Sequence, residues 1–97
     1  MENKSKLDPE YSDVVRNNPN KKFILYLRIH PGNANEDNLK AELVKEYGEC
    51  KELTEQRLVI FIVVGKRVQG FIDKLNASGT EMYLSFIQSK DEIGYGI

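Results

Sequence analysis

The stretch from Leu58 to Val64 is apolar at all seven positions, and this run constrains the fold of the chain more than any other feature. It is rich in β-branched residues, which favour strands. Because successive side chains of a strand point to opposite sides, a strand that is apolar throughout needs cover on both faces. A membrane-spanning helix needs roughly 20 apolar residues. The sequence therefore predicts a central strand over 57–64 and no membrane segment.

Three further strands are predicted. Residues 22–30 alternate, with one face made of Phe23, Leu25, Leu27 and Ile29 and the other of Ile24, Tyr26, Arg28 and His30. Residues 50–54 form a short, weakly patterned edge strand. In the last strand, over 81–88, one face is formed by Met82, Leu84 and Phe86 and the other by Tyr83, Ser85 and Ile87.

Two helices are predicted between these strands. Asn35, followed by two acidic residues, looks like the N-cap of a helix that ends before Gly48. Its buried side is expected to carry Leu39, Leu43, Val44 and Tyr47. After Gly65 the apolar residues Val68, Phe71, Ile72 and Leu75 recur with helical spacing, and Gly79 is expected to end that helix.

The N-terminal and C-terminal stretches are polar, and 97 residues leave room for one hydrophobic core. We expect a mostly flexible N-terminal arm over 1–21, a single α+β domain over 22–88 and a tail over 89–97. Within the arm, Asp8 and Pro9 favour a short helix over 9–16. That helix would lay Tyr11, Val14 and Val15 on the domain.

The strand and helix order is β-α-β followed by a second β-α-β. With right-handed crossovers it predicts a ferredoxin-like (βαββαβ) two-layer sandwich, with an antiparallel sheet in the order 4-1-3-2 and both helices on one face.

Catalytic chemistry finds little support in these residues. One cysteine and one histidine do not make a zinc site, and no calcium loop, phosphate loop or Gly-x-Ser-x-Gly elbow is present. In the predicted fold Cys50 and His30 lie on the order of 20 Å apart, which rules out a nucleophile and base pair. His30 is expected to hydrogen-bond locally. The expectation is a non-enzymatic protein without metal or cofactor and, since no secretory signal is seen, a cytoplasmic one.

The sheet face without helices is the leading candidate for a binding surface, because an exposed apolar patch indicates a partner. The residues predicted to line it are Ile24, Tyr26, Arg28, Val59, Phe61, Val63, Tyr83 and Ile87. A protein partner, a regulatory target blocked by occlusion, or a second copy of the chain would each bury this face. The net charge of −1 argues against binding nucleic acid by bulk electrostatics.

Nucleic acid remains the alternative, because Leu25–Arg28 resembles the start of the RNP2 motif of RNA-recognition motif domains, and Arg57–Ile62 is similar to RNP1. The resemblance implies an RNA or single-stranded nucleic-acid module in which Tyr26 and Phe61 stack on bases. The cations available for phosphates would then be Arg28, Arg57, Lys66 and Arg67.

A smaller candidate site lies at Gly65-Lys66-Arg67, where two cations begin a helix against the preference of its dipole. A phosphate or carboxylate bound to free backbone N–H groups would compensate, and the topology brings Lys21 and Lys22 to the same edge. The alternative is a set of solvated surface charges balanced by Glu46 and Glu49.

Overall fold

The chain forms a mixed α+β fold around one four-stranded antiparallel sheet. This computed structural model describes residues 9–30, 32–80 and 82–89. The strands are β1 (Lys22–Arg28), β2 (Lys51–Leu53), β3 (Leu58–Val64) and β4 (Tyr83–Ser89). Their order is β2-β3-β1-β4, which reads 4-1-3-2 from the other edge of the sheet. The apolar strand β3 is an inner strand, as its sequence predicts.

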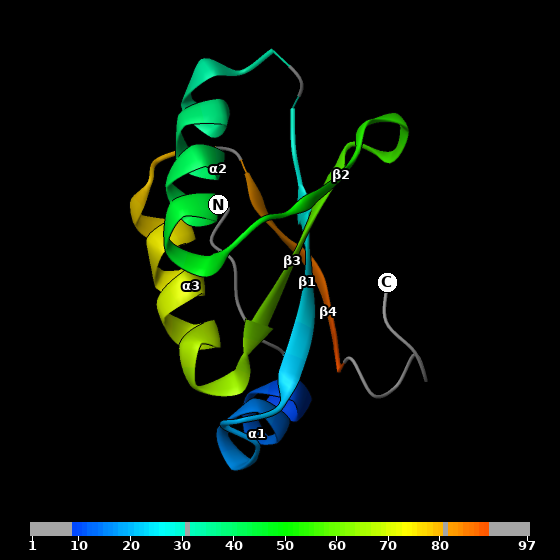
Figure 1. Cartoon of the computed structure of the whole chain (residues 1–97), viewed down its shortest axis with the longest axis vertical. Coiled ribbons are helices and arrows are strands. Elements are labelled where there is room, and N and C mark those ends of the chain that lie inside the picture. Colours follow the sequence, from blue (N-terminus) through cyan, green and yellow to red (C-terminus); the bar gives the residue numbers. More distant parts are fainter. Residues whose placement is uncertain (1–8, 31, 81, 90–97) are drawn as a thin grey trace.

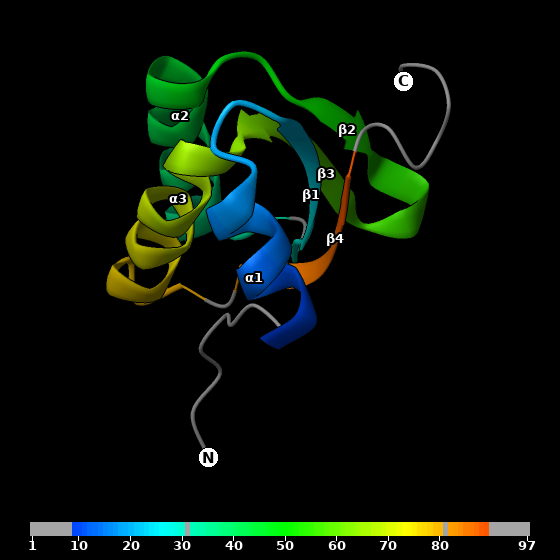
Figure 2. The ribbon, with the colours of Figure 1, turned by 90° about the horizontal axis from the view of Figure 1, so that it is seen from below.

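Helices α2 (Ala34–Tyr47) and α3 (Gly65–Ala77) lie side by side on one face of the sheet (Figure 1). A 3-10 turn over Thr54–Gln56 joins β2 to β3. The third helix, α1 (Pro9–Asn17), lies across the end of the molecule from which β1 and α3 begin (Figure 2).

The ends of α2 and α3 show how local sequence sets these helices. The N-cap of α2 is Asn33 and not the predicted Asn35: the side chain of Asn33 accepts a hydrogen bond of 3.1 Å from the Glu36 N–H. The Asn33 N–H donates to the His30 carbonyl oxygen instead of to Glu36, so the pair makes an N-cap without the reciprocal bond of a capping box. At the end of α3, Gly79 has a φ of +75°, so it terminates that helix as predicted.

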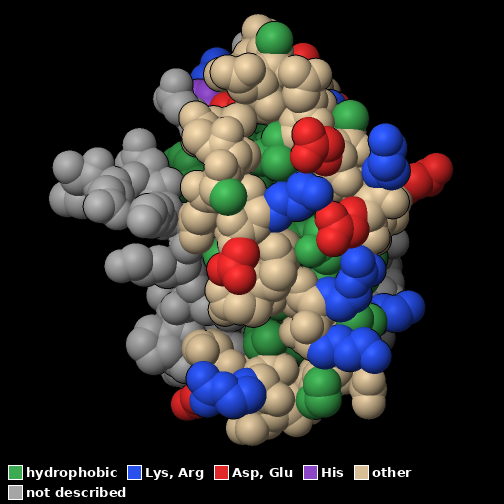
Figure 3. All heavy atoms as spheres, turned by 90° about the vertical axis from the view of Figure 1, so that its left-hand side faces the viewer, with side chains coloured by type: hydrophobic (Ala, Val, Ile, Leu, Met, Phe, Trp, Pro, Cys, Tyr) green, Lys and Arg blue, Asp and Glu red, His purple; other side chains and the backbone are tan. Residues whose placement is uncertain are grey.

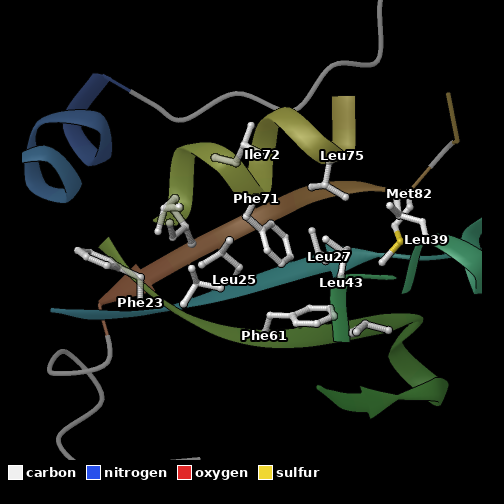
Figure 4. Close-up of a cluster of buried hydrophobic side chains, with 14 of the residues drawn as sticks. Phe23, Leu25, Leu27, Leu39, Leu43, Phe61, Phe71, Ile72, Leu75 and Met82 are labelled. Atoms are coloured by element: carbon white, nitrogen blue, oxygen red, sulfur yellow. The ribbon is translucent and has the colours of Figure 1, made fainter. Parts of the chain in front are cut away.

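The hydrophobic core lies between the two helices and the sheet (Figure 4). Phe71 of α3 is its centre, with its ring 5.1 Å from that of Phe61 and 5.0 Å from that of Tyr47. The same cluster contains Leu39 and Leu43 of α2.

The predicted facing of β3 is wrong. Val59, Phe61 and Val63 belong to the core beneath the helices and are buried. They pair with Leu27, Leu25 and Phe23 of β1, and directly opposed residues share one face of the sheet. The reason for the error is that β3 is apolar at every position, so its sequence does not reveal which side meets the helices.

The facing predicted for β4 is wrong at its C-terminal half. The register shifts between Tyr26 and Leu27 of β1, which pair with Phe86 and Leu84, so Ser85 is an extra residue on β4. Such a bulge breaks the period of two. Ile87 therefore lies in the core instead of on the opposite face, and Phe86 lies on the face opposite the helices.

Helix α1 packs on the fold through Val15, which is buried in the same core, whereas Val14 is 37% exposed, contrary to the prediction. The backbone after α1 then approaches the start of α3 closely. A methyl group at Gly65 would overlap the carbonyl oxygen of Asn18 and stand 3.1 Å from that of Val15. Residues 9–21 thus contribute to the fold. The predictions for 1–8 and for the tail after Ser89 lie outside the described residues.

Candidate functional site: the far face of the sheet

The sheet face opposite α2 and α3 is here called the far face. Its residues follow from the strand register, because they alternate with those that enter the core and because opposed residues share a face. They are Lys22, Ile24, Tyr26 and Arg28 of β1, Lys51 and Leu53 of β2, Leu58, Ile60, Ile62 and Val64 of β3, and Tyr83, Phe86 and Gln88 of β4.

Large apolar side chains are exposed on this face. Phe86 is 51% exposed and Ile62 is 36% exposed, while their neighbours Ile24 and Ile60 are buried. An exposed phenylalanine ring contributes none of the stabilising free energy that its burial would provide. Within the described residues, the only other large hydrophobic side chain of comparable exposure is Val14 on α1.

Aromatic rings gather on the side of the far face formed by β1 and β4. The Tyr26 and Phe86 rings have centroids 5.5 Å apart and are tilted by 49°. The Tyr26 hydroxyl donates a 3.1 Å hydrogen bond to Gln88 Oε1. This bond and the neighbouring ring hold the orientation of Tyr26. Tyr83 pairs with Arg28 in the next row, so the aromatic group extends along β4.

The charges of the far face all have one sign. Its described positions include the exposed cations Lys22, Arg28 and Lys51 and no acidic residue. The one acid of β2, Glu52, pairs with Val59 and therefore faces the helices, where it binds Lys40 at 3.1 Å. In the described part of the chain, no ion pair reaches these three cations.

The helix layer has the opposite character. Lys74 Nζ lies 2.9 Å from Glu46 Oε1, and Arg67 approaches a carboxylate oxygen of Glu46 at 4.0 Å and stacks on the Tyr47 ring. Acidic and basic side chains are interspersed over this side of the molecule (Figure 3). A hydrogen bond from Lys74, followed by the charges of Lys74 and Arg67, lowers the pKa of Glu46. Lys40, Arg67 and Lys74 of the helix side thus have acidic partners, whereas within the described residues Lys22, Arg28 and Lys51 of the far face have none.

The sequence locates part of this surface. Of the predicted partner-binding residues, Tyr26, Arg28 and Tyr83 lie on the far face, whereas Val59, Phe61, Val63 and Ile87 lie in the core. Phe61 therefore cannot stack on a base as the RNP1 resemblance implies. Among the residues that sequence reasoning missed are Ile62, Phe86 and Lys51. The bulge at Ser85 hides Phe86, and no short-range pattern marks that bulge.

Two of the donors on which the predicted anion site at Gly65 depends are already used by backbone carbonyl groups. The Gly65 N–H donates to the Lys21 carbonyl oxygen at 2.8 Å, and the Lys66 N–H donates to that of Pro19 at 2.9 Å. Since carbonyl oxygens carry partial negative charge, they occupy the first two N–H groups of α3 without a bound ion. Arg67 lies 4.0 Å from a carboxylate oxygen of Glu46, which agrees with the alternative prediction of surface charges balanced by nearby acidic residues.

His30 and Cys50 do not approach each other in a catalytic arrangement. His30 hydrogen-bonds locally, as predicted: its Nδ1 lies 2.8 Å from Glu36 Oε2, and its backbone N–H donates to Glu36 Oε1 at 2.6 Å. Glu36 is only 3% exposed, so this carboxylate ties the end of β1 to the start of α2. Burial raises the pKa of the Cys50 thiol. In the described ranges no group of three or more acidic, histidine or cysteine side chains gathers to hold a metal ion.

A surface hollow of about 330 Å³ lies between the start of α2 and the end of α3, on the helix side of the molecule. Asn38, Glu42, Lys74 and Thr80 are among its lining residues. Lys74 is already engaged with Glu42 and Glu46. This hollow is separate from the far face.

Comparisons of the chain with known protein families, with characterised proteins and with solved structures gave no match. Among residues 9–30, 32–80 and 82–89, no helix has the length and apolar character needed to cross a membrane.

Proposed function

We propose that this protein is a non-enzymatic interaction module that binds a macromolecular partner through its far face. The observation that carries the proposal is the exposure of Phe86 and Ile62 beside Tyr26, on a sheet face that none of the described helices covers. Large apolar side chains that stay exposed together on a small domain favour an interface.

The fold proposed for this module is a ferredoxin-like sandwich preceded by one extra helix. The order β1-α2-β2-β3-α3-β4 and the sheet order support it. In such a sandwich both crossover helices occupy one side, which leaves the other side for binding.

A second copy bound face to face is disfavoured as the partner. Such a dimer would bring two sets of Lys22, Arg28 and Lys51 together, with no acidic residue at the described far-face positions to offset them. Like charges placed against each other in an interface oppose association. The partner we propose is therefore a different macromolecule.

Hydroxyl-radical footprinting tests this function before the partner is known. The purified chain and the same chain in an extract of its source cells would be oxidised and compared residue by residue. We expect Tyr26, Tyr83 and Phe86 to become protected in the extract, while Tyr47 on the helix side keeps its reactivity. Equal oxidation of the far-face rings in both samples would contradict the proposal.

A matched pair of variants controls the footprint. Phe86→Asp places a charge in the exposed patch and should abolish the protection of Tyr26 and Tyr83. Val14→Asp makes the same change at an exposed apolar position of α1 and should leave the protection intact. Loss of protection in both variants would show that the far face is not the binding surface.

A further inference from the structure

The aromatic rings and the unpaired cations of the far face together indicate the chemistry of the partner. We infer that the far face binds single-stranded nucleic acid, with Phe86 and Tyr26 stacking on bases and with Lys22, Arg28 and Lys51 contacting phosphates. This inference rests on the proposed function and names the partner class for the same surface.

The charge of the far face favours an anionic partner. All three cations are exposed, and in the described part of the chain none of them has an acidic partner, whereas Lys40, Arg67 and Lys74 on the helix side are paired. The net charge of the whole chain is −1, so the separation of charges and not their sum sets the potential of this face. An anionic ligand is the complement of such a surface.

The geometry of the aromatic rings favours unpaired bases over a peptide. Phe86 is half exposed and stands beside Tyr26, whose orientation is held by the hydrogen bond to Gln88. The carboxylates of an acidic peptide would neutralise the cations, but they have no aromatic face to stack on these rings. Unpaired bases supply both features, because every base has a face for stacking and every nucleotide carries a phosphate.

The spacing of the cations around the rings suits an extended strand with regularly placed phosphates. Lys22 and Arg28 are six residues apart on β1, which is roughly 20 Å at the usual rise of a strand. Lys51 pairs with Ile60, which pairs with Tyr26, so it lies in the same row as the rings at the opposite edge of the sheet. The cations thus lie on three sides of the Tyr26 and Phe86 pair. A nucleic-acid strand that crosses the rings carries one phosphate per base, so its phosphates would pass near these cations.

Fluorescence anisotropy with the purified full chain tests the inference. The probes are labelled single-stranded RNA and DNA of mixed sequence, the matching DNA duplex and a labelled poly-glutamate peptide. We expect both single strands to bind more tightly than the duplex, whose base faces are hidden, and more tightly than the peptide. With about three phosphate contacts, raising the salt from about 50 to about 200 mM should weaken single-strand binding roughly 20-fold.

Two exposed substitutions separate stacking from charge. Phe86→Leu keeps an apolar side chain but removes the ring, and should weaken single-strand binding roughly 5- to 150-fold. Lys51→Gln should weaken it less and flatten its salt dependence. Lys45→Gln, the same change at an exposed position of α2, is the matched control and should have no effect. Unfolding curves of all variants check that each one folds.

Several outcomes would overturn the inference: no binding of either single strand, equal binding by Phe86→Leu and the unaltered chain, an equal effect of Lys45→Gln and Lys51→Gln, or tighter binding of the peptide. The footprint distinguishes this failure from failure of the proposed function. Far-face protection that persists after nuclease treatment of the extract would retain the interaction module and exclude nucleic acid as its partner.

Discussion

At the scale of single residues, the carboxylate of Glu36 is the most consequential polar group. It is buried, accepts a hydrogen bond from the His30 backbone N–H and lies 2.8 Å from Nδ1 of the His30 ring, so it joins β1 to α2. The connection between the first strand and the second helix therefore depends on one side chain.

Replacing Glu36 should lower the stability of the protein. Glu36→Ala leaves the partly buried N–H of His30 without its acceptor, and we expect the free energy of unfolding to fall by about 1.5–3 kcal/mol. Asp37→Ala removes an exposed acid from the same turn, and its cost through the helix dipole should be about 0.3–1 kcal/mol. Urea denaturation of the two variants measures the difference, and equal losses would show that the bonds to His30 contribute nothing.

The pKa of Glu46 provides a residue-scale test of the helix layer. Its hydrogen bond with Lys74 is the main cause of its lowered pKa. Lys74→Gln should therefore move the pKa of Glu46 up toward its ordinary value, as measured by NMR titration of the carboxyl carbon. Lys45→Gln on the same helix should leave it in place, and an unchanged pKa in Lys74→Gln would contradict the assignment.

The sign of this effect fixes its pH window. A carboxyl with a lowered pKa in the folded state adds stability above its unfolded pKa, and that stability is lost as the pH falls through the folded pKa. The pair of Glu46 and Lys74 is solvent-exposed, so its share of the total stability is small.

At the scale of elements, the docking of α1 on α3 depends on a glycine. Gly65→Ala would press a methyl group into the backbone of Asn18, and we expect it to destabilise the fold by about 1–3 kcal/mol. Gly70→Ala in the same helix meets only the Tyr47 hydroxyl, at 3.4 Å, and should stabilise by up to about 1 kcal/mol through helix propensity. Thermal denaturation of both variants gives the comparison. A stable Gly65→Ala variant would mean that α1 moves away without cost.

The sequence predicts the existence and type of all four strands and both crossover helices, because their periods and their glycine boundaries are local signals. It does not predict which side of β3 meets the helices, since all seven positions are apolar. It also misplaces Phe86, because the extra residue at Ser85 is set by pairing with β1. The candidate site is therefore predictable on β1, where the two faces differ in polarity, and unpredictable on β3.

At the scale of the whole molecule, the charge distribution is not visible in the composition. A net charge of −1 argues against nucleic-acid binding when it is averaged over the chain. The sheet, however, places Lys22, Arg28 and Lys51 together on one side, and Glu52 turns toward the other. Strand pairing, which brings β2 beside β3, creates this asymmetry.

The position of β1 between β3 and β4 has a consequence for how the protein is made. β1 is synthesised long before β4. The hydrogen bonds on one edge of β1 form only when Tyr83–Ser89 has paired with it. Until then the apolar strand β3 packs on an incomplete sheet. Contacts between residues far apart in the sequence form slowly. We therefore expect the nascent chain to expose the apolar side chains of β3 until β4 has paired, a state that favours aggregation and that holdase chaperones are suited to protect.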